Sequence, residues 1–154
     1  MPKKNENHPA IPEFSIIEDN NEQFTKIDIV GKTISDIIVL GGSAGKDNLK
    51  VDGYLLICFT DGNILGLSAF DATFFATYNY RTDTAEFREE TANRSLTGPF
   101  ARETVGKTVV ASTFNGEALH GNPLTLSIEL DNGMLLMLEA SFSDDILNVT
   151  LQRR

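Results

Sequence analysis

Two Gly-Lys-Thr triplets, at residues 31–33 and 106–108, are the segments of the sequence that come closest to a chemical motif. Gly-Lys-Thr closes the phosphate-binding loop of many nucleotide-binding proteins, in which the lysine contacts the phosphates. That loop also needs a glycine five residues before its second glycine, and these positions hold Lys26 and Ala101. Both triplets lead into strand-like sequences rather than helices. They therefore predict structural turns, in which the glycines supply backbone freedom.

The glycine-rich stretch at residues 41–47 also resembles a phosphate loop. Its glycine spacing is wrong, and Asp47 stands where the motif has a hydroxyl residue. We therefore expect this stretch to be a flexible loop.

The other reactive side chains do not form a catalytic pattern. His8 and His120 are the only histidines, which argues against a metal site or a serine-type triad. Cys58 is the only cysteine and lies mid-strand, where buried thiols are usually inert. The pairs Asp144-Asp145 and Glu89-Glu90 are chain neighbours, which point apart in a strand or helix. We predict no catalytic residue, no metal, no cofactor and no enzymatic activity.

The elements that would position any site come in two copies. Residues 30–33 (Val-Gly-Lys-Thr) recur at 105–108, and Asp61-Gly62 recurs as Asn132-Gly133. Asp-Gly and Asn-Gly are the strongest short signals for a two-residue hairpin turn. Alternating apolar residues flank each turn, and they match six against six at an offset of 71. These are Leu55, Ile57, Phe59, Leu65, Leu67 and Ala69 in the first copy, and Leu126, Ile128, Leu130, Leu136, Leu138 and Ala140 in the second.

We therefore predict an all-β, mainly antiparallel fold built from two duplicated β-meander units. Repeat one covers about 30–80 and repeat two about 105–151. A unit of this size cannot cover its own apolar face, so the two should pack as a sandwich or barrel of about eight strands. Together they form one domain, 14–154, after a disordered tail at 1–13.

One short helix is expected between the units, in an insert at about 83–97. Asp83 or Thr84 would cap it, and it would run to Arg94. Gly98-Pro99 would then end the helix and mark the linker.

The repeats differ on the outer face of the strand that precedes each hairpin turn. Repeat two has Thr125, Ser127 and Glu129 there, whereas repeat one has Tyr54, Leu56 and Cys58. Leaving three such side chains in water would forgo several kcal/mol at about 25 cal/mol per Å². A cover is therefore expected, either another segment of the chain or a partner surface. The segments considered are the stretch around Phe14, Ile16 and Ile17 and the helix carrying Phe87.

A cluster of aromatic residues in repeat one has no full counterpart in repeat two. At period two, Phe74, Tyr78 and Tyr80 share one face of the predicted strand and Phe75 lies on the other. Such residues build cores, but they also line ligand cavities and anchor interfaces. The candidate binding residues are thus Tyr54, Leu56, Cys58, Phe70, Phe74, Phe75, Tyr78 and Tyr80.

Composition narrows the choice of partner and compartment. The net charge is −9, which argues against nucleic acid because phosphate binding needs a basic patch. A basic protein partner is compatible with this charge. The sequence shows no secretory signal and no apolar run of membrane-spanning length, and the lone cysteine favours a reducing compartment. We therefore expect a cytoplasmic protein without a membrane partner.

The pattern Val-Gly-Lys-Thr-Ile, followed by Phe59-Thr60-Asp61-Gly62 between apolar strands, resembles small bacterial β proteins, many of them uncharacterised or of the toxin-immunity type. The resemblance covers roughly 30–70 and 105–140 and rests on hairpin motifs. It implies a non-enzymatic protein that acts by binding another protein, and it carries over no site residue.

Three functions follow from these observations. The first is a protein-binding module, an inhibitor or immunity-like partner of another protein. The second is a β-barrel that binds a small apolar ligand against its aromatic cluster. The third is a homo-oligomeric structural protein that self-associates through the face carrying Tyr54, Leu56 and Cys58.

Overall fold

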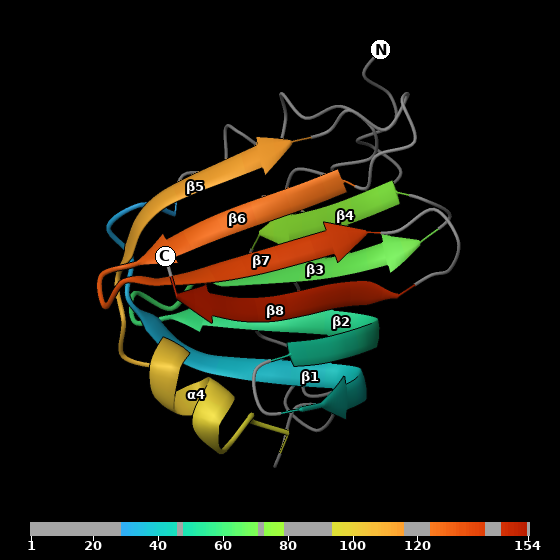
Figure 1. Ribbon diagram of the computed structural model, residues 1–154, viewed down its shortest axis with the longest axis horizontal. Coiled ribbons are helices and arrows are strands. Elements are labelled where there is room, and N and C mark those ends of the chain that lie inside the picture. Colours follow the sequence, from blue (N-terminus) through green and yellow to red (C-terminus); the bar gives the residue numbers. More distant parts are fainter. Residues whose placement is uncertain are drawn as a thin grey trace.

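The strands follow the two sequence repeats, four to each. The computed structural model describes residues 29–45, 48–70, 73–78, 94–115, 124–140 and 146–153. The tail at 1–13, the stretch 79–93 with Tyr80 and most of the predicted helix, and both histidines lie outside these ranges. Repeat one holds β1 (Ile34–Ala44), β2 (Asn48–Phe59), β3 (Ile64–Phe70) and β4 (Thr73–Tyr78). Helix α4 (Pro99–Thr104) precedes repeat two, which holds β5 (Val109–Asn115), β6 (Leu124–Leu130), β7 (Met134–Ala140) and β8 (Leu147–Arg153) (Figure 1).

All strand pairs are antiparallel, as predicted, and they form one continuous sheet in the order β4-β3-β2-β8-β7-β6-β5. Strand β2 connects the repeats because it pairs with β1 along one edge and with two strands along the other. Its residues Asn48–Val51 pair with β8, and Leu55–Cys58 pair with β3. The predicted barrel alternative is wrong, because β4 and β5 end the sheet and no pairing joins them within the described residues. Strands β3 and β7, which are not neighbours in the sheet, contact each other across the core, as in a sandwich.

A glycine corner folds the long β1–β2 ribbon over, so that its far end reaches β8. The pairing of β1 with β2 shifts register between Leu40 and Gly42. A Cβ atom at Gly53 would lie 2.0 Å from the Leu40 carbonyl oxygen, and one at Gly42 would lie 2.1 Å from the Lys50 carbonyl oxygen. The two backbones therefore approach too closely for any side chain at the bend. The stretch at 41–47 was predicted to be a flexible loop, but its residues Gly41–Ala44 are the end of β1.

Both hairpins form where the sequence predicts them, but each turn has three residues instead of the predicted two, with the glycine in the last place. Gly62 and Gly133 have positive φ angles of 94° and 85°. Each turn glycine donates its N–H to the last residue of the preceding strand, Phe59 or Leu130. All twelve flanking apolar residues are buried, with exposures of 8% or less, because alternate residues of each strand face one core.

The two repeats meet around a local two-fold axis. Thr33 and Thr108 form an isolated antiparallel bridge, and their Oγ1 atoms lie 2.8 Å apart. The hydrogen bonds around them occur in equivalent pairs: Gly31 N–H donates to Val109 O at 2.8 Å, and Gly106 N–H donates to Ile34 O at 2.7 Å. Ile34 N–H to Lys107 O and Val109 N–H to Lys32 O are both 2.9 Å. The two Val-Gly-Lys-Thr segments therefore pair with each other, and Gly31 and Gly106 provide the turns.

Helix α4, the helix within the described residues, lies later in the chain than the predicted helix, most of which falls outside them. Gly98 is the N-cap residue of α4, and Pro99 occupies its first turn, where a missing N–H costs nothing. Gly98-Pro99 therefore begins a helix instead of ending one. Just before it, Ser95 forms a bridge with Ile38 and Leu96 N–H donates to Ile37 O at 2.7 Å, so this linker segment lies along β1. Within the described residues, no helix has the length and apolar character needed to cross a membrane.

Candidate functional site: the outer face of the first repeat

Six apolar side chains from three strands form a second cluster on the sheet face opposite the main core. The strand register places Ile38 beside Leu56, Leu40 beside Tyr54, and Cys58 beside Ile64. We call these residues the outer cluster: Ile38, Leu40, Tyr54, Leu56, Cys58 and Ile64.

The outer cluster has a buried centre and an accessible rim. Leu56 is 0% exposed and Ile38 is 7% exposed, whereas the other four side chains are half-buried. Leu56 therefore acts as a packing residue within the chain, and a partner would touch mainly the rim. Tyr54 and Leu40 lie side by side on this rim.

The same face of repeat two is more polar and more open, although it also carries the half-buried Leu135 and Met137. Ser127, the counterpart of Leu56, is half-buried, and its hydroxyl donates to the Met137 sulfur at 3.1 Å. The contrast extends to the first strand of each unit, because Ile38 and Leu40 correspond to Thr113 and Asn115 at the offset of 75. Sequence comparison of the second strands alone missed Ile38 and Leu40. Carrying the same comparison through the first strands would have found both.

The predicted aromatic residues belong to β4 and to the end of β3, apart from Tyr80. The β3–β4 register puts Phe74 opposite Ala69 and Tyr78 opposite Leu65, and both of these partners belong to the main core. Phe75 is opposite Ser68, the position next to the Phe74–Ala69 pair. Phe70 ends β3 opposite Thr73, and Tyr80 lies outside the described residues. The assignment of these aromatic residues to a binding site stays a prediction.

Cys58 is protected from thiolate chemistry by its surroundings. Burial, and then the nearby Asp36 carboxylate, raise the pKa of the Cys58 thiol to about 11. Asp36 is itself held in place, because it accepts hydrogen bonds from Ile37 N–H at 2.8 Å and from the Ser95 hydroxyl at 2.7 Å. At neutral pH the thiol is therefore protonated and a poor nucleophile.

The lysines of the two Gly-Lys-Thr triplets contact the protein itself. Lys32 forms an ion pair with Asp61, and its ammonium nitrogen lies 5.9 Å from the centre of the Phe59 ring. Hydrogen bonds from Lys32 and from Asn63 N–H lower the pKa of the Asp61 carboxyl. Lys107 donates to the Arg102 carbonyl oxygen at 3.2 Å. Lys32 therefore contacts the turn between β2 and β3, and Lys107 contacts the end of α4.

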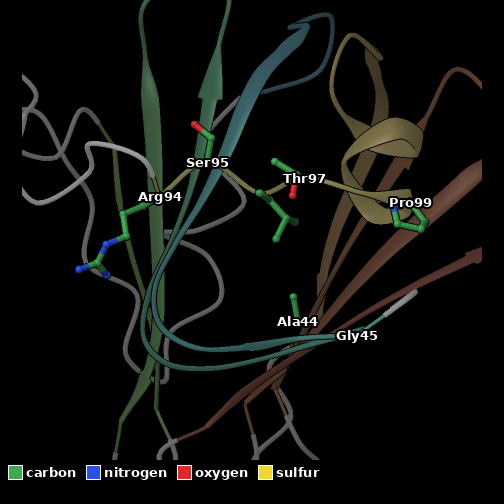
Figure 2. Close-up of a pocket in the computed structure, with 7 residues that line it drawn as sticks. Ala44, Gly45, Arg94, Ser95, Thr97 and Pro99 are labelled. Carbon is green, nitrogen blue, oxygen red and sulfur yellow. The ribbon is translucent and has the colours of Figure 1, made fainter.

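A shallow open groove lies between the tip of the β1–β2 ribbon and the segment before α4 (Figure 2). Ala44 and Gly45 form one side, and Ser95, Thr97 and Pro99 form the other. Figure 2 shows the Arg94 guanidinium pointing away from Ala44 and Pro99. Leu96 also lines the groove, and none of the lining residues is a carboxylate or a histidine that could form an acid–base pair. In the part of the chain that the structure describes, no group of three His, Cys, Asp or Glu residues is placed to hold a metal ion.

The outer cluster is therefore the best-defined candidate site, and its chemistry is that of apolar contact. Comparisons with protein-family models, with curated proteins and with solved structures found no match to this chain.

Proposed function

We propose that this chain is a non-enzymatic protein-binding module that inhibits or neutralises a partner protein, and that it contacts the partner through the rim of the outer cluster. The observation that carries the proposal is the difference between the two repeats. One fold unit, used twice, has Leu40 and Tyr54 half-buried on its outer face in repeat one, where repeat two has Asn115 and Thr125. Folding of the unit does not require the apolar pair, since repeat two folds without it.

Contact through this rim would supply binding free energy by burying apolar surface. Burying apolar surface contributes about 25 cal/mol per Å², and Tyr is among the residues most enriched in binding hot spots. Tyr54 offers an aromatic ring beside an apolar neighbour, Leu40.

The distribution of charge supports a basic partner. The described residues carry seven acidic and six basic side chains, a net charge of −1 out of the chain's −9. The remaining acidic excess lies in residues 1–28, in 79–93 and between the strands. Charge of one sign steers association, and its effect falls as salt is added.

Affinity capture with matched variants tests the proposal. Leu40→Asn/Tyr54→Thr gives repeat one the rim residues of repeat two. Leu135→Thr/Met137→Thr is the control, because it removes two half-buried apolar side chains from the outer face of repeat two. We expect one specific protein to be retained by the wild type and the control, to be lost from the rim variant, and to lose activity when the wild-type chain is added.

Equal retention by the rim variant and the wild type would contradict the assigned surface. Retention of no specific protein at physiological salt would contradict the function itself. Far-UV circular dichroism and thermal melting of each variant show whether a loss reflects the surface or unfolding.

A further inference from the structure

The outer edge of β5 is unpaired along most of its length in the described part of the chain. Strand β5 is the last strand of the sheet, with β6 on one side only. Its start is covered, because Val109 exchanges hydrogen bonds with Gly31 and Lys32. Beyond Val109 the strand has a bulge, and Val110 is 47% exposed. The strand sequence VVASTFN contains no charged residue and no proline, the usual means by which natural sheets protect an edge.

The equivalent edge of repeat one is closed by the chain itself. Past the matching bulge in β1, Ile37 N–H donates to the Asp36 carboxylate at 2.8 Å. Ile37 C=O accepts from Leu96 N–H at 2.7 Å, and Ser95 bridges to Ile38. Both backbone groups of Ile37 are therefore occupied on the side away from β2.

In the described part of the chain, the equivalent backbone N–H and C=O groups of repeat two have neither of these hydrogen-bond partners. The residue equivalent to Ile37 is Ser112, and the residue equivalent to Asp36 is Ala111, whose methyl group accepts no hydrogen bond. Because alternate residues of a strand direct their N–H and C=O to the same edge, Ser112 and Phe114 present four backbone groups to the open side. Within the described ranges, no segment takes the place that Ser95 and Leu96 take on β1.

We propose that this edge pairs with the β5 edge of a second copy of the chain, antiparallel and about a two-fold axis through Thr113. In that register Ser112 of each copy lies opposite Phe114 of the other, so that all eight outward-facing backbone groups are paired. An uncharged edge can meet its own copy without repulsion, and two-fold pairing closes the assembly at a dimer.

The chain contains an antiparallel pairing of equivalent segments directly beside this edge. At the local two-fold axis, the segments around Thr33 and Thr108 pair antiparallel through equivalent hydrogen bonds. The open edge continues directly from that junction, because Val109 is the last β5 residue that it covers. The proposed dimer therefore extends the pairing of β5 from Val109, which the chain covers itself, to Ser112 and Phe114, which a second copy would cover.

Disulfide trapping tests the register. Residues opposite each other in a non-hydrogen-bonded antiparallel pair have Cα atoms about 4.5 Å apart, within the range for a disulfide. We expect Thr113→Cys to form a covalent dimer under mild oxidation. The control is Thr150→Cys, in the central strand β8, which should remain monomeric on a denaturing gel. The native Cys58 should not contribute, because its thiol stays protonated at neutral pH.

Mass measurement tests the dimer without a new cysteine. Multi-angle light scattering should give twice the chain mass of 16.9 kDa for the wild type and for Thr150→Lys, and the monomer mass for Thr113→Lys. Amide exchange of Ser112 should slow as protein concentration rises.

Three results would overturn the proposal. One is a wild-type monomer at about millimolar concentration. Another is protection of the Ser112 amide that does not depend on protein concentration, because another part of the same chain would then cover the edge. Growth beyond dimers would indicate pairing of β5 with β4 of the next copy. The Thr113→Cys trap remains decisive if Thr113→Lys fails to fold.

Discussion

At the scale of single residues, the hydrogen bond between Thr33 and Thr108 is the centre of the local symmetry. The two hydroxyl oxygens are 2.8 Å apart and part-buried, and each residue occupies the same place in its own repeat. Either substitution, Thr33→Val or Thr108→Val, leaves the other hydroxyl without this partner. We expect each to lower the free energy of unfolding by about 1 kcal/mol, and the two losses to be equal.

The double variant distinguishes a shared bond from two separate contributions. Thr33→Val/Thr108→Val replaces both hydroxyls by methyl groups of the same shape, so its loss should fall short of the sum by about 0.5–1 kcal/mol. Urea unfolding of the four proteins measures this coupling. Strictly additive losses would show that the bond contributes nothing of its own.

Cys58 gives a prediction for alkaline pH. Its pKa is raised from 9.0 to about 11, so the folded state favours the protonated thiol more strongly than the unfolded state does. This stabilisation is fully present below pH 9 and is lost as the pH rises through 11. We expect Cys58→Ser, which has no thiol to titrate, to lose less stability than the wild type between pH 9 and pH 11.

Urea titrations of both proteins at several pH values in this window measure that difference. All other titratable groups are common to the two proteins, so the difference between the curves reports on Cys58. Parallel curves would contradict the pKa assignment.

At the scale of elements, the glycine corner is what lets one ribbon serve two parts of the sheet. Gly53→Ala would place a Cβ atom 2.0 Å from the Leu40 carbonyl oxygen and push β1 and β2 apart. We expect the far end of the ribbon to detach from β8, with a loss of about 2–3 kcal/mol or more. Amide exchange at Leu49 and Val51, which pair with β8, should accelerate.

Gly62→Ala is the matched control for the corner. Its φ of 94° is unfavourable for alanine, but a Cβ there meets nothing within 4 Å. It should cost about 1–2 kcal/mol of turn strain and leave the exchange of Leu49 and Val51 unchanged relative to global unfolding. Similar exchange profiles in both variants would show that the corner does not hold the β2–β8 pairing.

The elements predictable from the sequence are those specified by local chemistry. Gly62 and Gly133 determine the hairpins through positive φ angles, and the apolar alternation around them determines the core face. The corner at 41–44 was missed, because closely spaced glycines indicate a loop unless the opposing strand is known to approach within contact distance. Helix α4 was missed because Gly98-Pro99 is compatible with either end of a helix. In the structure Ser95 pairs with β1 at Ile38, and the helix begins only after Gly98.

The candidate site was partly predictable for a similar reason. Comparison of the repeats identified the face carrying Tyr54, Leu56 and Cys58, since substitutions at equivalent positions are visible in the sequence alone. That Leu56 is fully buried while Tyr54 remains at the rim depends on packing from outside the strand, which no periodicity reports. Likewise, the open edge of β5 follows from strand order, which hairpin signals do not determine.

At the scale of the whole molecule, the repeats are joined in two separate places. One is the two-fold junction around Thr33 and Thr108, and the other is the pairing of Asn48–Val51 with β8. The main core is also shared, because it includes Leu65 of repeat one and Leu136 of repeat two in one cluster. Unfolding one repeat would therefore expose the apolar face of the other.

This arrangement predicts that the chain unfolds in a single cooperative transition. In differential scanning calorimetry, the ratio of the calorimetric to the van't Hoff enthalpy should be near 1. Two repeats that unfolded separately would each contribute about half of the heat, and the ratio would approach 2.

Gly53→Ala provides the internal test, because it weakens only one of the two connections. If the β2–β8 pairing couples the repeats, this variant should raise the ratio above that of Gly62→Ala. If both variants keep a ratio near 1, the shared core and the Thr33–Thr108 junction are sufficient for cooperativity.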